Sequence, residues 1–198
     1  MKNCAIVGIN WGDEGKGRMV DLLTQEYDVV VRYQGGGNAG HTVINEYGKV
    51  ALHLLPSGIF REGVVNILGN GVALDLANLW TEIESVTAKG VPITPENLKI
   101  SDRAILTLPY HVQLDCLEEE RLAGEKYDST RRGIAPVYGD KYMKKAIRAG
   151  DLLDLDYLAK RLKGVVAYKS LTIEGVYKAE PLCYDELFAW LKKYAEMY

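Results

Sequence analysis

The chain has 198 residues, of which 47% are apolar and 26% are charged, and 24 Lys and Arg against 27 Asp and Glu give a formal net charge of −3. These values exclude a disordered tail, a collagen-like repeat and a disulfide scaffold, and a slightly acidic chain is not built to coat nucleic acid or an anionic membrane. The length is enough for a buried core, and we predict a single α/β domain over residues 1–198.

Apolar runs separated by glycine-rich turns predict short strands in the N-terminal part of the chain. In chain order we expect a buried parallel strand at 4–7, a helix at 16–25, a strand at 29–31, a hairpin with strands at 43–45 and 50–54, and a strand at 64–68. The run Gly69-Asn70-Gly71 is expected to end the last of these strands in a turn.

Longer amphipathic segments predict mainly helices in the rest of the chain. In chain order we expect a helix at 74–89, a strand at 98–100, a helix at 109–122, a long loop at 123–142, and helices at 152–162 and 184–197. Strands that alternate with helices predict an α/β fold in which a mostly parallel central sheet is flanked by helices.

The cysteines and the apolar runs predict a cytoplasmic protein. Cys4, Cys116 and Cys183 lie far apart without CxxC spacing, which predicts reduced, mostly buried thiols. The apolar run at 4–7 is too short for a signal peptide, and no run approaches the roughly 20 apolar residues that a membrane helix needs.

A glycine-rich loop separates the first expected strand from the first expected helix: Gly8-Ile9-Asn10-Trp11-Gly12-Asp13-Glu14-Gly15-Lys16-Gly17-Arg18. Such a loop lets backbone N–H groups and a helix N-terminus approach phosphate oxygens. It resembles a P-loop but has Asn10 in place of the first glycine and Gly17 in place of the Mg²⁺-binding Ser or Thr. Asp13 is then the obvious oxygen ligand for Mg²⁺. A plain glycine-rich turn is the alternative, which the two carboxylates beside Gly-Lys-Gly disfavour.

A second glycine cluster, Gly35-Gly36-Gly37-Asn38-Ala39-Gly40, formally matches GxGxxG. A β-pattern follows it where a dinucleotide site needs a helix, so we reject that site. What remains is a loop that presents Asn38, His41 and Thr42 near the carboxyl ends of strands. His41 is the candidate acid or charge-stabilising group, whereas His53 and His111 are expected to be structural.

The segment from Asp128 to Arg148 is basic in an otherwise acidic chain. Its charged residues are Arg131, Arg132, Lys141, Lys144, Lys145 and Arg148 against Asp128 and Asp140. Together with Ser129 and Thr130 these cations suit a second phosphate site, and a solvated basic surface is an equal alternative.

Three runs taken together resemble the adenylosuccinate synthetases. They are Trp11-Gly12-Asp13-Glu14-Gly15-Lys16-Gly17, Gln34-Gly35-Gly36-Gly37-Asn38-Ala39-Gly40-His41-Thr42 and Leu54-Leu55-Pro56-Ser57-Gly58. Gly69-Asn70-Gly71-Val72 and Arg132-Gly133-Ile134-Ala135-Pro136, with Tyr138, Asp140 and Lys141, continue the match. Chains of that family are longer, so the resemblance implies the N-terminal part of the family fold. The segments of the family that recognise the guanine base of GTP and bind the substrate aspartate have no counterpart in these 198 residues.

The resemblance implies a GTP- and Mg²⁺-dependent ligase that joins IMP and L-aspartate to adenylosuccinate in AMP synthesis, as a homodimer. Asp13 would take the N1 proton of IMP, so that O6 attacks the γ-phosphate of GTP and a 6-phosphoryl-IMP intermediate forms. His41 would act as an acid or electrostatic stabiliser. The aspartate amine would then displace phosphate. A nucleotide-binding domain without turnover and a folded piece with neither property are the alternatives.

The resemblance also implies which residues bind each partner. For GTP they are Gly12, Asp13, Glu14, Gly15, Lys16, Gly17, Arg18, Gly40, His41 and Thr42. For IMP they are Asp13, Glu14, Gly15, Lys16, Asn38, Ala39, Gly40, His41, Thr130 and Lys144. For Mg²⁺ they are Asp13 and the backbone carbonyl of Gly40. Lys144 replaces an arginine that reaches the IMP phosphate of the neighbouring subunit, which exchanges a bidentate contact for a point charge.

Overall fold

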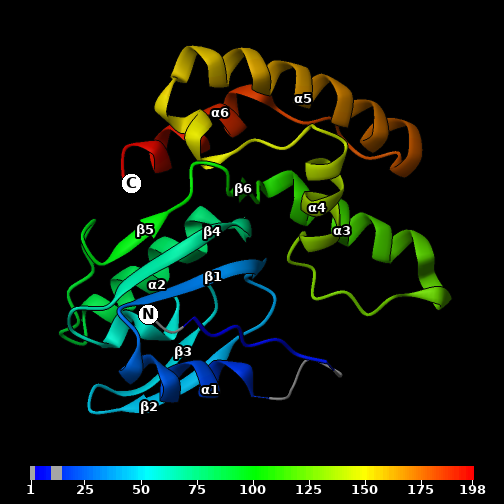
Figure 1. Ribbon diagram of the computed structural model, residues 1–198. Helices are drawn as coiled ribbons and strands as arrows, with labels where there is room; N and C mark the ends of the chain where they lie inside the picture. Colours follow the sequence, from blue (N-terminus) through cyan, green and yellow to red (C-terminus); the bar gives the residue numbers. More distant parts are fainter. Residues whose placement is uncertain (1–2, 10–14) are drawn as a thin grey trace.

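A parallel sheet forms the centre of the computed structural model, which describes residues 3–9 and 15–198 (Figure 1). Its strands are β1 (Val29–Gly36), β4 (Val65–Leu74), β5 (Leu98–Ile100) and β6 (Ile105–Leu106). Strand β4 pairs in parallel with β1 on one side, and β5 and β6 pair in parallel with β4. The predicted α/β fold with a parallel sheet flanked by helices is confirmed.

Strand β4 does not end at the Gly69-Asn70-Gly71 run, so the turn that we expected there is wrong. The register slips between the pairs Arg32↔Leu68 and Gln34↔Gly71, so β4 carries an extra residue opposite β1. A Cβ at Gly71 would clash with the carbonyl oxygen of Tyr33. The glycines therefore permit a bulge and a close backbone approach within one long strand.

The remaining elements surround this sheet. They are α1 (Lys16–Leu23), the hairpin of β2 (His41–Asn45) and β3 (Gly48–Leu52), α2 (Leu76–Thr87), α3 (Pro109–Leu122), α4 (Ile134–Tyr142), α5 (Leu155–Tyr177) and α6 (Tyr184–Ala195). Short 3₁₀ turns lie at η1 (Thr24–Glu26), η2 (Ser57–Phe60), η3 (Ala123–Glu125) and η4 (Ala149–Leu153). The helix α3 has its predicted bounds, and the hairpin is present, but both of its strands begin two residues earlier than expected. His41 and Thr42 therefore belong to β2 and not, as we expected, to the glycine-rich loop. The long loop expected at 123–142 is wrong because it contains α4, and α5 is far longer than the helix expected at 152–162.

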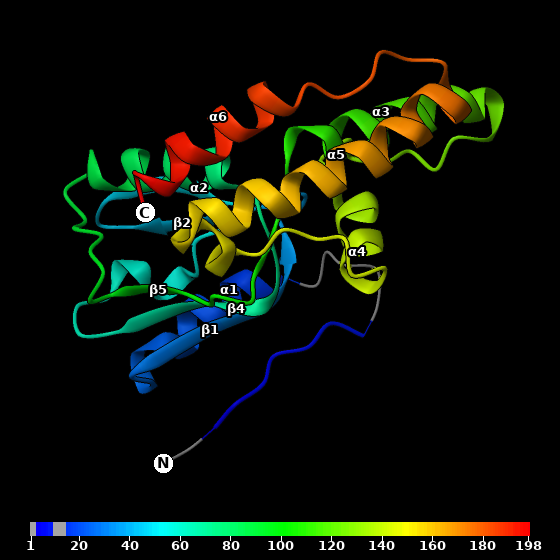
Figure 2. The ribbon, with the colours of Figure 1, turned by 90° about the horizontal axis from the view of Figure 1, so that it is seen from above.

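The two C-terminal helices lie at the opposite end of the sheet from α1 and the hairpin. In Figure 1, α5 and α6 lie above β5 and β6, whereas α1 and the hairpin lie below β1. Seen from above in Figure 2, α5 runs beside α6 and α3, and it contacts both. The main core gathers apolar side chains from the hairpin, β4, α2, α5 and α6. No helix within 3–9 and 15–198 is long and apolar enough to cross a bilayer.

The N-terminal segment does not form the buried strand that we expected at 4–7. Residues 3–9 have no regular secondary structure, and Val7 and Ile9 are 62% and 87% exposed. Among the residues that the structure describes, β1 pairs only with β4. Residues of β1, α1 and the N-terminal segment together line a groove of about 400 Å³. All three cysteines are free as predicted, but Cys4 and Cys183 are exposed, contrary to the expected burial.

Candidate functional site

The loops that follow β1 and β4 lie at one edge of the sheet, because the carboxyl ends of parallel strands meet there. The loop 37–40 follows β1, and Asp75 follows β4, where it caps α2 by accepting a hydrogen bond of 3.0 Å from the backbone N–H of Asn78. Tyr138 of α4 reaches the same edge. Its hydroxyl accepts from the N–H of Gly35 at 3.0 Å and donates to the carbonyl of Gly71 at 2.7 Å. Two strand ends and α4 are thereby fixed to one another.

His41 is the first residue of β2, and it lies against the first turn of α1. Its Nε2 is 2.8 Å from Oγ of Ser57, and that Oγ lies 3.3 Å from the carbonyl oxygen of Gly17. A Cβ at position 17 would come within 2.6 Å of Cβ of His41. The structure thus gives a physical reason for the second departure from the P-loop pattern. A Ser or Thr side chain at 17 would occupy the space of the imidazole.

The environment of His41 favours a neutral ring. Burial lowers the pKa of His41, and the charge of Arg32 lowers it further, against the opposing carboxylates of Glu82 and Asp21. Near neutral pH the imidazole is therefore uncharged, with one nitrogen able to donate a hydrogen bond and the other able to accept one.

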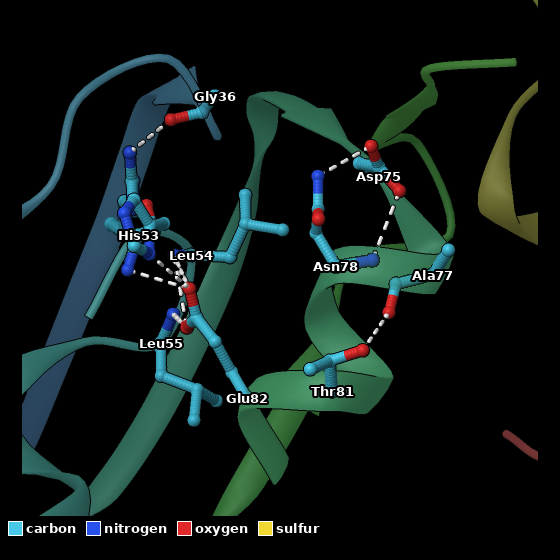
Figure 3. Close-up of polar contacts among 10 residues, drawn as sticks. Gly36, His53, Leu54, Leu55, Asp75, Ala77, Asn78, Thr81 and Glu82 are labelled. Carbon is cyan, nitrogen blue, oxygen red and sulfur yellow. Dashed lines mark hydrogen bonds and ion pairs between the residues drawn. The ribbon is translucent and has the colours of Figure 1, made fainter. Parts of the chain in front are cut away.

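The buried carboxylate of Glu82 holds the chain just after the hairpin. Figure 3 shows it pointing from α2 at three successive backbone N–H groups. It accepts from His53 at 2.6 Å, from Leu54 at 3.0 and 3.1 Å, and from Leu55 at 2.9 Å. In addition, Nδ1 of His53 lies 3.3 Å from Oε1 of Glu82. These contacts fix the segment that leads into Ser57.

Arg32 joins the end of β3 to the end of β1. Its guanidinium donates to the carbonyl of His53 and, at 2.8 Å, to the carbonyl of Gly36. The end of β1 and the loop 37–40 that follows it leave no room for a side chain at Gly36 and at Gly40. A Cβ at Gly36 would lie 2.6 Å from Cδ1 of Ile134, and one at Gly40 would lie 2.8 Å from Cδ2 of His53.

We expect Glu82→Gln to lower the free energy of unfolding of the 198-residue chain by about 2–4 kcal/mol. The glutamine amide keeps one acceptor oxygen and turns an NH₂ group toward N–H donors that Glu82 now satisfies. Glu84→Gln on the same helix is the control because that side chain is exposed, and it should change stability by less than about 0.5 kcal/mol. Urea titration compares the two. Equal free energies of unfolding for the two variants would contradict the role of Glu82 in holding the backbone of residues 53–55.

Two carboxylates of α3 hold the loop that precedes α4. Asp115 accepts from the hydroxyl of Ser129 at 2.6 Å and from the N–H of Gly133 at 2.8 Å, and Glu119 accepts from the N–H of Tyr127 at 3.2 Å. Sequence reasoning missed these two residues. Their spacing of four residues, which places both on one helix face, is the signal that it had available.

A buried network of hydrogen bonds and an ion pair around Asp140 holds α4 in place. Asp140 accepts hydrogen bonds from Tyr110 at 2.7 Å and from Nε2 of His111 at 3.1 Å, and it pairs with Lys169 of α5. Nδ1 of His111 accepts from the N–H of Leu108 at 2.8 Å, so Nε2 carries the proton. His111 is thus a structural histidine, as predicted.

The predicted site residues fall into three groups. Gly12, Asp13 and Glu14 lie outside the described residues. Gly15, with φ +78°, is the N-cap of α1, and Lys16, Gly17 and Arg18 form its first turn. Asn38, Ala39, Gly40 and Thr42 are exposed around His41, which the structure brings together with Gly17.

Thr130 and Lys144 form the third group, and both are exposed. They flank opposite ends of α4, a helix of nine residues, which is about 13 Å long. No group of three or more His, Cys, Asp or Glu that suits a metal occurs in the part of the chain that the structure describes. The Mg²⁺ prediction therefore rests on the carbonyl of Gly40 and on Asp13.

Comparison with known proteins places the chain in a family. The family model of adenylosuccinate synthetase matches residues 5–198. The adenylosuccinate synthetase of Dehalococcoides mccartyi is 48% identical over 192 residues, which is 97% of this chain and 45% of that protein. The adenylosuccinate synthetase of Coxiella burnetii is 47% identical over 194 residues, which is 98% of this chain and 44% of that protein.

The solved structures agree. The structure of fully ligated adenylosuccinate synthetase from Plasmodium falciparum matches with a TM-score of 0.81 at 30% identity, covering 94% of this chain and 42% of that one. A cyanophage succinoaminodeoxyadenylate synthetase shares the fold, with a TM-score of 0.55 at 23% identity. The chain spans less than half the length of the curated relatives it matches. It belongs to the adenylosuccinate synthetase family.

Proposed function

We propose that this chain is the catalytic, phosphate-binding part of a ligase that uses GTP to join IMP and L-aspartate into adenylosuccinate, with GDP and phosphate released, in purine biosynthesis. The observation that carries the proposal is the position of His41 against the first turn of α1, in a chain whose family match covers residues 5–198. We take residues 1–198 as one α/β domain, the N-terminal part of the longer family fold.

The proposed catalytic residues, Asp13 and His41, have different tasks in the reaction. Asp13 removes the N1 proton of IMP, so that O6 becomes a nucleophile toward the γ-phosphate of GTP. The neutral ring of His41 donates a hydrogen bond to a phosphate oxygen as negative charge develops there. Backbone N–H groups of the first turn of α1 hold the other phosphate oxygens. The amine of aspartate then displaces phosphate from the 6-phosphoryl-IMP.

The donor set that we propose for a metal suits Mg²⁺. A carboxylate and a backbone carbonyl are hard oxygen ligands, which this ion prefers. Asp13 and the carbonyl of Gly40 would hold it, and when bound it would neutralise part of the phosphate charge.

We propose that Thr130 and Lys144 serve different subunits of a homodimer. Because they flank opposite ends of α4, they are poorly placed to hold the same phosphate group within one chain. Thr130 would contact IMP of its own subunit and Lys144 the IMP phosphate of the neighbour. A cytoplasmic location stays a prediction.

The direct test is an assay of the 198-residue chain with GTP, Mg²⁺, IMP and aspartate. Calorimetry measures nucleotide binding, and phosphate release together with adenylosuccinate formation measures turnover. Binding without product would favour the second candidate, a nucleotide-binding domain without turnover, which the short span relative to the curated relatives supports. Absence of both from the full-length natural protein would refute the proposal.

We expect His41→Asn to lower kcat of the full-length natural protein by at least about tenfold, because the amide cannot match the imidazole as a donor to the developing phosphate charge. Lys49→Gln at the tip of the same hairpin is exposed and should leave kcat within about twofold. Steady-state kinetics compare the two. A loss of kcat below tenfold in His41→Asn would argue against its catalytic role.

A further inference from the structure

Ser57 is a buried hydroxyl between two parts of the candidate site. Ser57 is the first residue of η2 and is only 1% exposed. Its Oγ lies 2.8 Å from Nε2 of His41 and 3.3 Å from the carbonyl oxygen of Gly17. The proposed reaction gives this serine no task.

The two contacts of the hydroxyl allow one arrangement in which each group has a partner. The carbonyl of Gly17 can only accept, and we assign the single proton of the hydroxyl to it. Oγ of Ser57 then accepts from His41, which must carry its proton on Nε2. Nδ1 of His41 is left as an acceptor.

The backbone around Ser57 is held on both sides, so the hydroxyl has a fixed position. Glu82 clamps the three N–H groups of residues 53–55 just before it. All four residues of η2 are buried, and a Cβ at Gly58 would lie 2.7 Å from Oδ1 of Asn66. A hydroxyl on such a segment imposes its geometry on the imidazole.

We propose that Ser57 is a positioning residue that holds His41 as the Nε2–H tautomer against α1 until a nucleotide phosphate takes over the same donor. A phosphate oxygen is the stronger acceptor because it is charged, so the exchange from hydroxyl to phosphate is favourable. The second half of this inference rests on the proposed function, whereas the tautomer in the ligand-free chain does not.

The test is ¹⁵N NMR of the histidine side chains in the ligand-free 198-residue chain. We expect His41 to show a protonated Nε2 whose proton exchanges slowly with water. In Ser57→Ala that proton should exchange at least about tenfold faster, because its acceptor is gone. Ser170→Ala is the matched control, since it removes a serine hydroxyl of α5 that bonds only Leu182 among the contacts described. It should leave the His41 signals unchanged.

Three results would overturn the positioning role: a proton on Nδ1 of His41 in the wild-type chain, unchanged exchange in Ser57→Ala, or equal changes in Ser170→Ala. The position of the His41 proton is measured on the wild-type chain, so this outcome can be tested even if Ser57→Ala does not fold. Ser57→Thr keeps a hydroxyl and should retain the slow exchange.

Addition of GTP with Mg²⁺ then separates this inference from the proposed function. We expect the Nε2 resonance of wild-type His41 to move on saturation. If GTP leaves His41 unperturbed while the Ser57-dependent tautomer is present, the positioning role stands and the proposed function fails.

Discussion

Asp140→Asn is expected to lower the free energy of unfolding of the 198-residue chain by about 3–5 kcal/mol, the typical cost of leaving a buried charge unpaired. Asp140 is fully buried, and Lys169, its partner from α5, is only 6% exposed. A neutral amide cannot compensate the buried ammonium. Because the carboxylate also accepts from Tyr110 and His111, the substitution disturbs the contacts that join α3, α4 and α5.

A second variant distinguishes the unpaired charge from general damage. Lys169→Met combined with Asp140→Asn removes both charges, so the double variant should be at least about 1 kcal/mol more stable than Asp140→Asn alone. Asp156→Asn, an exposed position at the start of α5, should change stability by less than about 0.5 kcal/mol. Urea titrations give the three values. A double variant no more stable than Asp140→Asn would contradict the explanation.

The same network sets part of the pH dependence of stability. Burial alone would raise the pKa of Asp140, but hydrogen bonds from His111, Lys169 and Tyr110 outweigh it and hold that pKa below its usual value. Burial lowers the pKa of His111, against the attraction of Asp140. In both cases the unfolded chain binds the proton more readily, so the free energy of unfolding falls on acidification. The fall begins below about pH 6.5 through His111 and continues below about pH 4 through Asp140.

The sequence predicts those elements whose pattern is local. The helix α3, which opens at Pro109, and the short alternating segment of β5 are recognisable within their own residues, and both were predicted with their observed bounds. The helix α4 was missed because its sequence contains Pro136 and Gly139, which weaken a helical signal. Proline is tolerated there because it lies in the first turn, and the helix is held by distant partners such as Lys169.

The candidate site also contains residues that local sequence reveals and residues that it does not. Glycine runs and a histidine are visible in the sequence, so the loop at 15–18 and His41 were predicted as candidates. Ser57 and Glu82 were not, because their roles arise only when segments 16 to 40 residues apart come together. The apolar run at 4–7 reads locally as a strand, but a strand also needs a hydrogen-bonded neighbour. Within the described parts of the chain, 3–9 and 15–198, β4 is the single partner of β1.

Asp13→Asn is expected to lower kcat of the full-length natural protein by at least about a hundredfold, the lower end of what a positioned general base contributes. The amide has nearly the size of the carboxylate but cannot accept the N1 proton of IMP, so O6 would not become nucleophilic. Binding of GTP should change little, since backbone N–H groups and Lys16 would still hold its phosphates. Single-turnover kinetics and calorimetry on the same preparation measure both effects.

Because Asp13 is also the proposed Mg²⁺ ligand, the experiment has to separate a lost base from a weakened metal site. Raising the Mg²⁺ concentration would refill a weakened site and restore turnover, whereas it cannot replace a missing base. Asp28→Asn, an exposed carboxylate beyond α1, controls for the change in charge and should leave kcat within about twofold. Activity of Asp13→Asn that recovers with Mg²⁺ would assign Asp13 to the metal alone, and persistent loss at saturating Mg²⁺ supports proton abstraction from IMP.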